Sequence, residues 1–117
     1  MPDSNDLLLE EIQKLFLEPV IGSGYGNTYG EVNLINLVAK YRSLNADQMR
    51  RMSEILVDFS TSTDLASSYI SVGVLHALGM TEQVEAAYAW AATQDEGQSI
   101  ASHFDIGRSL ADHFIGG

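Results

Sequence analysis

The stretch 65-LASSYISVGVLHALG-79 decides the fold, because it contains the longest apolar-rich run of the chain, from Tyr69 to Leu78. A run of this length is far below the roughly 18 residues that a membrane-spanning helix needs. Gly79 follows the run at the position of a left-handed C-terminal cap. We therefore predict a helix from Asp64 to Leu78 and expect it to be the most buried element of the domain.

The helix before this stretch has clear start signals. Asn45 and Gln48 have the spacing of a capping box, in which each side chain satisfies a free backbone amide of the first turn. Leu44 and Met49 lie at the positions of a hydrophobic staple. Four charged residues on the exposed side of this helix can pair at i, i+4 spacing, Asp47 with Arg51 and Arg50 with Glu54.

Apolar residues recur with a period of about 3.6 through the rest of the chain, and no segment alternates as a strand would. We predict that Thr28 and Glu31 form a capping box at the start of the second helix, and that Thr81 caps the fifth. The expected helices are 5–18, 28–43, 45–59, 64–78, 81–94 and 99–115. The last helix is expected to bend at Gly107 and to bury Ile100, Phe104, Leu110, Ala111 and Phe114.

These patterns predict a single all-α domain over residues 1–117, with about six helices. Short links favour antiparallel neighbours, so we expect the third helix to form a hairpin with the fourth, and the fifth with the sixth. The hairpins could pack as a compact bundle or as a short solenoid.

The stretch 65–79, with its Ala- and Leu-rich turn closed by Leu78 and Gly79, resembles the second helix of a HEAT-type repeat. The resemblance covers about one repeat. It implies stacked helical hairpins that bind other proteins on an exposed helical face.

The charge of the chain is strongly negative and unevenly placed. The 117 residues carry 16 acidic and 6 basic side chains, for a net charge of −10. Residues 52–117 contain Arg108 as their only lysine or arginine. Nucleic acid and anionic membranes would be repelled, because binding to phosphates depends on lysine and arginine. With no cysteine and an acidic N-terminal stretch where a secretory signal would be basic, we expect a cytoplasmic protein without disulfides.

The segment 22–30, GSGYGNTYG, is rich in glycine and precedes a helix, as phosphate-binding loops do. It lacks the preceding strand and third glycine of a dinucleotide fingerprint, and it has no lysine for a P-loop. A mobile connection explains it, and contact with a partner is the functional alternative, because binding loops favour Tyr, Ser, Gly and Asn. The candidate contact residues are Tyr25, Asn27 and Tyr29.

No catalytic or metal-binding motif is present. His76 lies in the apolar fourth helix, where a core histidine bonded to a carbonyl is the expected role. The spacing of His103 and His113 places them on different helix faces, so we predict no metal site and no cofactor. Exposed carboxylates need no special role, but four of them are candidates for partner contact, namely Glu54, Asp58, Asp95 and Glu96.

These observations favour a non-enzymatic, acidic module that binds a basic protein partner. In size and charge the chain is similar to bacterial toxin-immunity proteins, which implies an inhibitor whose carboxylates occupy the phosphate-binding cleft of a toxin nuclease. Two alternatives remain. One is a helical adaptor or oligomerisation domain, for which self-association is open, and the other is a small enzyme or ligand binder using His76, His103 or His113.

Overall fold

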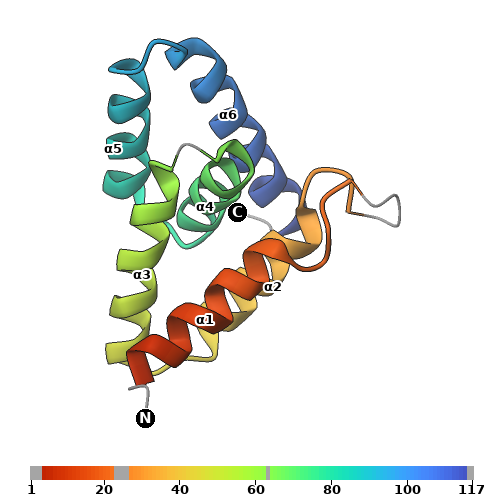
Figure 1. Ribbon diagram of the computed structural model, residues 1–117, viewed down its shortest axis with the longest axis vertical. Helices are drawn as coiled ribbons and strands as arrows, with labels where there is room; N and C mark the ends of the chain where they lie inside the picture. The colour runs from red at the N-terminus through yellow and green to blue at the C-terminus, as the bar shows by residue number, and fades with distance from the viewer. Residues whose placement is uncertain (1–3, 23–26, 63, 116–117) are drawn as a thin grey trace.

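The computed structural model describes residues 4–22, 27–62 and 64–115, and these residues form helices joined by short connections without any strand (Figure 1). The helices are α1 (Ser4–Leu17), α2 (Glu31–Arg42), α3 (Ala46–Ser60), α4 (Leu65–Ala77), α5 (Thr81–Ala92) and α6 (Gly97–Phe114). The predicted all-α class and the positions of six helices are thus confirmed. Among the residues described, no helix combines the length and hydropathy that crossing a bilayer requires.

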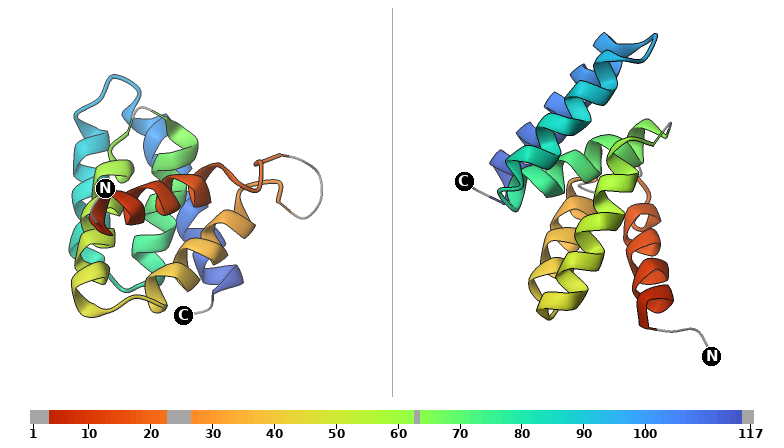
Figure 2. Two further views of the ribbon diagram at one scale, coloured as in Figure 1. Left: turned by 60° about the horizontal axis from the view of Figure 1, so that its bottom comes forward. Right: turned by 90° about the vertical axis from the view of Figure 1, so that its left-hand side faces the viewer.

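Helix α4 lies at the centre of the molecule. It contacts α2, α3, α5 and α6, and every residue from 68 to 75 is buried. Figure 2 shows α1, α2 and α3 grouped on one side of α4, with α5 and α6 on the other. The arrangement is the compact bundle of the two predicted alternatives, because one helix touches four others instead of only its neighbours along a stack.

The backbones of α4 and α6 approach each other closely at two glycines. A Cβ atom added to Gly107 would lie 2.0 Å from the carbonyl oxygen of Tyr69. A Cβ added to Gly73 would lie 2.6 Å from the carbonyl oxygen of Gly107. Glycine is therefore required on both helices for this contact. Gly107 lies inside the continuous helix α6, where the absence of a side chain permits its close packing on α4.

The ends of α3 and α4 follow the sequence signals. The Asn45 side chain accepts a hydrogen bond from the Gln48 amide at 2.9 Å, and the Gln48 side chain accepts one from the Asn45 amide at 3.2 Å. At the end of α4, Gly79 adopts φ 76°, and the Met80 amide donates to the carbonyl of Leu75 at 3.0 Å. Both the predicted capping box and the predicted glycine cap are confirmed.

Two predicted N-terminal caps need correction. Helix α2 begins at Glu31, with Gly30 as its N-cap in a left-handed conformation, so Thr28 lies before the cap. The Glu31 carboxylate still reaches back to the amides of Thr28 and Tyr29, which is half of the expected box. The N-cap of α5 is Met80, so Thr81 is one residue inside the helix and makes no capping bond.

The predicted ion pairs of α3 involve the right residues in the wrong combination. Arg50 pairs with Asp47 at 2.8 Å, and Arg51 pairs with Glu54 at 3.2 Å. Both pairs span three residues instead of four. Side chains at either spacing are neighbours on a helix surface, so the charge pattern alone does not distinguish the two combinations.

The α4–α6 contact leads to a prediction for Gly107→Ala. Alanine is favoured over glycine inside a helix by about 1 kcal/mol, which would stabilise α6 on its own. The added methyl group would overlap a backbone oxygen that cannot rotate away, and such overpacking costs about 1–3 kcal/mol or more. We expect the free energy of unfolding to fall by about 2 kcal/mol in urea denaturation. The control Ser109→Ala, at an exposed position of α6, should change it by less than about 0.5 kcal/mol. An unchanged or increased stability of Gly107→Ala would contradict the contact.

Candidate functional site

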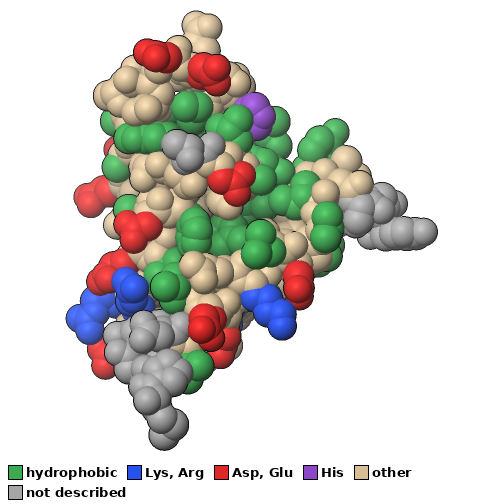
Figure 3. All heavy atoms as spheres, in the orientation of Figure 1, with side chains coloured by type: hydrophobic (Ala, Val, Ile, Leu, Met, Phe, Trp, Pro, Cys, Tyr) green, Lys and Arg blue, Asp and Glu red, His purple; other side chains and the backbone are tan. Residues whose placement is uncertain are grey.

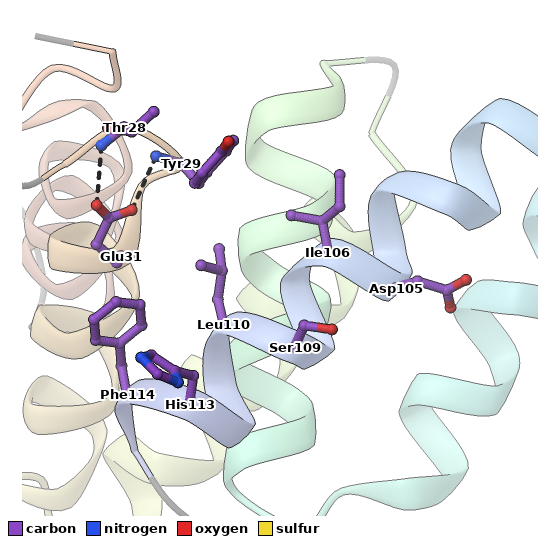
Figure 4. Close-up of a pocket in the computed structure, with 9 residues that line it drawn as sticks. All are labelled: Thr28, Tyr29, Glu31, Asp105, Ile106, Ser109, Leu110, His113 and Phe114. Carbon is purple, nitrogen blue, oxygen red and sulfur yellow. Dashed lines mark hydrogen bonds between the residues drawn. The ribbon is translucent and has the colours of Figure 1, made fainter. Parts of the chain in front are cut away.

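A groove of about 820 Å³ lies between the segment that precedes α2 and the C-terminal half of α6 (Figure 4). Its lining residues come from two parts of the chain that are more than 70 positions apart, and they are Thr28, Tyr29, Glu31, Asp105, Ile106, Ser109, Leu110, His113 and Phe114. The groove exists because α4 holds α2 and α6 on its surface at the same time.

The α6 wall of the groove is an apolar stripe of Ile106, Leu110 and Phe114, spaced four residues apart and therefore on one helix face. Ile106 is 40% exposed and Phe114 is 46% exposed, whereas Leu110 is 8% exposed between them. The predicted burial of Phe114 is therefore wrong. Burial requires a neighbouring element as well as an apolar period, and Phe114 lies at the last residue of α6.

The opposite wall is held in place by hydrogen bonds to the backbone of Tyr29. The buried Tyr69 of α4 donates its hydroxyl to the Tyr29 carbonyl at 2.6 Å. The Glu31 carboxylate accepts from the amides of Thr28 and Tyr29, both at 2.9 Å. The Tyr29 side chain remains 57% exposed. The backbone beneath it is thus fixed while its ring faces the groove (Figure 4).

Tyr69 links the groove to the alkaline stability of the protein. Burial, and secondarily the negative charge of Glu31, raise the pKa of the Tyr69 hydroxyl above its ordinary value of 10.0. The folded state therefore prefers the protonated phenol, and its contribution to stability is present below the unfolded pKa and lost as the pH rises above it.

For this reason we expect the Tyr69→Phe variant to lose less unfolding free energy than the wild-type protein as the pH rises above about 9. Wild-type protein should lose unfolding free energy between about pH 9 and pH 11, as the unfolded tyrosine ionises first. Tyr69→Phe should start less stable at neutral pH, having lost the bond to Tyr29, but should decline less over that window. Urea denaturation at several pH values measures both curves, and parallel curves would refute this role of Tyr69.

Asn27 is a structural residue of the loop, which corrects its prediction as a partner-contacting side chain. It is 2% exposed. Its side-chain nitrogen donates to Asn33 Oδ1 at 2.9 Å and also to the carbonyls of Pro19 and Val20. Its side-chain oxygen accepts from the Val32 amide at 2.9 Å. Asn27 thus links residues 19, 20, 32 and 33 by hydrogen bonds at the described ends of the loop. Tyr25, the remaining candidate of this loop, lies outside the described residues.

Asn27→Ala should destabilise the fold strongly for a loop substitution. It would leave buried polar groups without partners, each costing about 1–3 kcal/mol. We expect the unfolding free energy to fall by about 2–3 kcal/mol in urea denaturation. Thr28→Ala, at the exposed neighbouring position, is the control and should be nearly neutral. A loss below about 0.5 kcal/mol for Asn27→Ala would show that its hydrogen bonds do not hold the loop.

The four acidic candidates are all exposed, but they differ in their surroundings. Glu54 is paired with Arg51, so its charge is compensated locally. Asp58, Asp95 and Glu96 form no ion pair with any residue that the structure describes. On the face drawn in Figure 3, the visible lysine and arginine side chains lie in the lower part, whereas acidic side chains extend to the top.

Asp95 and Glu96 border a hollow of about 370 Å³ at the turn between α5 and α6. Its remaining lining residues are Ser62, Leu65, Trp90, Gln94 and Ile100. The half-buried indole of Trp90 and two aliphatic side chains thus lie next to two exposed carboxylates.

Tyr29 and the carboxylates of Asp95 and Glu96 lie at different ends of α6. The turn with Asp95 and Glu96 precedes α6, while Tyr29 faces the C-terminal half of the same helix (Figure 1). At 1.5 Å per residue, Glu96 and Leu110 are about 20 Å apart along the helix axis. A partner that contacts both sites must therefore extend along α6.

The histidines have separate local roles. His76 Nε2 lies 2.8 Å from Asp112 Oδ1, and its side chain is 28% exposed. The prediction of a core histidine bonded to a carbonyl is therefore wrong, because this edge of α4 meets a carboxylate of α6. His103 Nδ1 lies 2.7 Å from the Ser99 carbonyl oxygen on its own helix. Within the described ranges, no group of three histidine or acidic side chains is arranged to hold a metal ion.

Arg108, the only lysine or arginine of the second half, is directed at Tyr88 of α5. Its guanidinium carbon lies 5.7 Å from the centre of the Tyr88 ring. The Tyr88 hydroxyl in turn donates to Asp105 Oδ1 at 2.6 Å. This small network joins α5 to α6. Arg108 lies in the C-terminal half of α6, whereas Asp95 and Glu96 precede the first residue of that helix.

Comparison with known proteins supplies no relative: no protein-family model, curated protein or solved structure matches this chain. The resemblances to HEAT-type repeats and to toxin-immunity proteins therefore stay predictions.

Proposed function

We propose that this protein is an acidic module that binds a basic protein partner, and most specifically an immunity-type inhibitor of a basic toxin such as a nuclease. The observation that carries the proposal is the excess of exposed acidic side chains on α3, α5 and the α5–α6 turn. Its members without an ion pair among the described residues are Asp58, Glu82, Glu85, Asp95 and Glu96.

A surface with an excess of negative charge attracts a basic partner before the two proteins touch. Complementary potentials raise association rates by one to three orders of magnitude and suppress partners of the same sign. Each exposed ion pair formed on contact contributes only about 0–1 kcal/mol, so the collective field matters more than any single carboxylate.

The hollow beside Asp95 and Glu96 supports a basic partner for a second reason. A lysine or arginine side chain has an apolar stem and a charged head, and the stem can pack on aliphatic and aromatic surface. Here the stem would pack against Leu65 and Ile100, with the head close to the carboxylates and to Trp90. Cations over a tryptophan ring gain about 0.5–2 kcal/mol.

The test compares two double charge reversals, Asp95→Lys with Glu96→Lys and Glu10→Lys with Glu18→Lys. Both change the net charge equally, and all four positions are exposed. Proteins captured by the immobilised chain from the cells that encode it are identified, and their association rates are measured. We expect a basic partner whose association slows at least about tenfold between low and high salt.

The reversal at residues 95 and 96 should slow association by about tenfold or more, and the reversal at residues 10 and 18 by less than about threefold. A partner that is not basic, an association rate independent of salt, or equal effects of the two reversals would contradict the proposal.

A further inference from the structure

The groove beside α6 concentrates the exposed apolar surface of the molecule. Eight large apolar side chains are exposed among the described residues, and three of them, Tyr29, Ile106 and Phe114, line this one groove. Single exposed apolar side chains need no explanation, whereas a contiguous group of them marks a site of interaction. Figure 3 also shows hydrophobic side chains gathered along α6 and toward the start of α2.

From this groove we infer the form of the partner's contact: it binds an amphipathic helix of the basic protein partner, with apolar side chains between Tyr29 and α6 and with lysine or arginine beside them. The inference rests on the proposed function, because it assigns to the same basic partner a second contact at the other end of α6.

The shape of the apolar stripe favours a helix. Ile106, Leu110 and Phe114 repeat every four residues, which is the row that packs into the groove of a neighbouring helix. The row is about 12 Å long at 1.5 Å per residue, or slightly more than two turns. A partner helix needs only apolar residues at i, i+3 or i+4, and i+7 to cover it.

The charges around the groove favour a basic occupant. Among the described residues, the charged side chains that line it are Glu31 and Asp105, apart from the titratable His113. Glu31 is 8% exposed with both oxygens occupied, so it contributes negative potential rather than a direct contact. Asp105 is exposed at the rim, and its side chain points away from Tyr29 toward α5 (Figure 4), where one oxygen accepts the Tyr88 hydroxyl. No described residue donates to its other oxygen, so Asp105 contributes negative potential at the edge of the groove.

The same charges disfavour a second copy of this chain as the occupant. Each copy has a net charge of −10, so association would bring like charges together on both sides of the contact. A basic helix instead supplies the opposite charge at the rim while it buries the apolar stripe.

The groove requires little reorganisation before it binds. The Tyr29 backbone is fixed by Tyr69 and Glu31, and the stripe lies on a helix that is packed closely on α4 through Gly107. A preformed site loses less conformational entropy on binding. Tyrosine also supplies a large contact area with few rotatable bonds, which is typical of residues that dominate binding energy.

The probe for this site is a phage-displayed library of 18-residue peptides with apolar residues at helical spacing and randomised flanking positions. The chain is the target for selection, and the selected peptides are then synthesised. We expect the selected flanking positions to be enriched in lysine and arginine, and expect chemical-shift changes on binding to centre on Tyr29, Ile106 and Phe114.

The matched variants are Ile106→Ser and Val57→Ser. Both remove a branched aliphatic side chain of similar exposure from a helix, 40% for Ile106 and 36% for Val57, but only Ile106 lines the groove. Ile106→Ser should weaken the selected peptide at least about tenfold, and Val57→Ser less than about twofold. Replacing lysine and arginine in the peptide by glutamate should weaken it at least about tenfold. Circular dichroism confirms that both variants are folded.

Several results would overturn the inference. They are the absence of selected peptides, enrichment of acidic or uncharged flanks, equal effects of the two variants, and a concentration-dependent dimer that Ile106→Ser abolishes. The two proposals can also fail separately. If the natural partner is lost on reversing the charges of Asp95 and Glu96 but binds Ile106→Ser normally, the groove assignment is wrong and the proposed function stands.

Discussion

The backbone contact between α4 and α6 is the constraint on which the rest of the structure depends. Gly73 and Gly107 remove the side chains that would otherwise hold the two helices apart. Helix α6 can therefore lie directly on the most buried helix of the bundle, where Phe104 and Ala111 complete the core. A wider separation would open a cavity along α4, and residual cavities cost stability in proportion to their volume.

Both candidate surfaces follow from this placement of α6. The N-terminal end of α6 brings Asp95 and Glu96 beside Trp90, and its C-terminal half faces Tyr29 across the groove. The buried Tyr69 connects the core to the groove. Its carbonyl lies against Gly107 of α6, and its hydroxyl donates a hydrogen bond to the backbone of Tyr29. The core thus fixes the position of the binding surfaces as well as the stability of the fold.

The sequence was sufficient for the features that depend on neighbours along the chain. Helical periodicity located all six helices to within about three residues, and the Asn45 and Gly79 caps were predictable from local spacing. Features that depend on residues distant in sequence were not predictable. The fit of Gly107 on Tyr69 and the exposure of Phe114 require knowledge of which helices meet, and the burial of Asn27 requires the positions of Pro19 and Asn33.

The most direct test of this account is a nuclear Overhauser measurement across the α4–α6 contact. The Gly107 proton that occupies the position of a Cβ points at the backbone between Tyr69 and Gly73. The account predicts a cross-peak between a Gly107 Hα and the Gly73 amide proton. Its absence, together with cross-peaks from the Tyr69 and Gly73 backbone to a helix other than α6, would contradict both the fold and the surfaces derived from it.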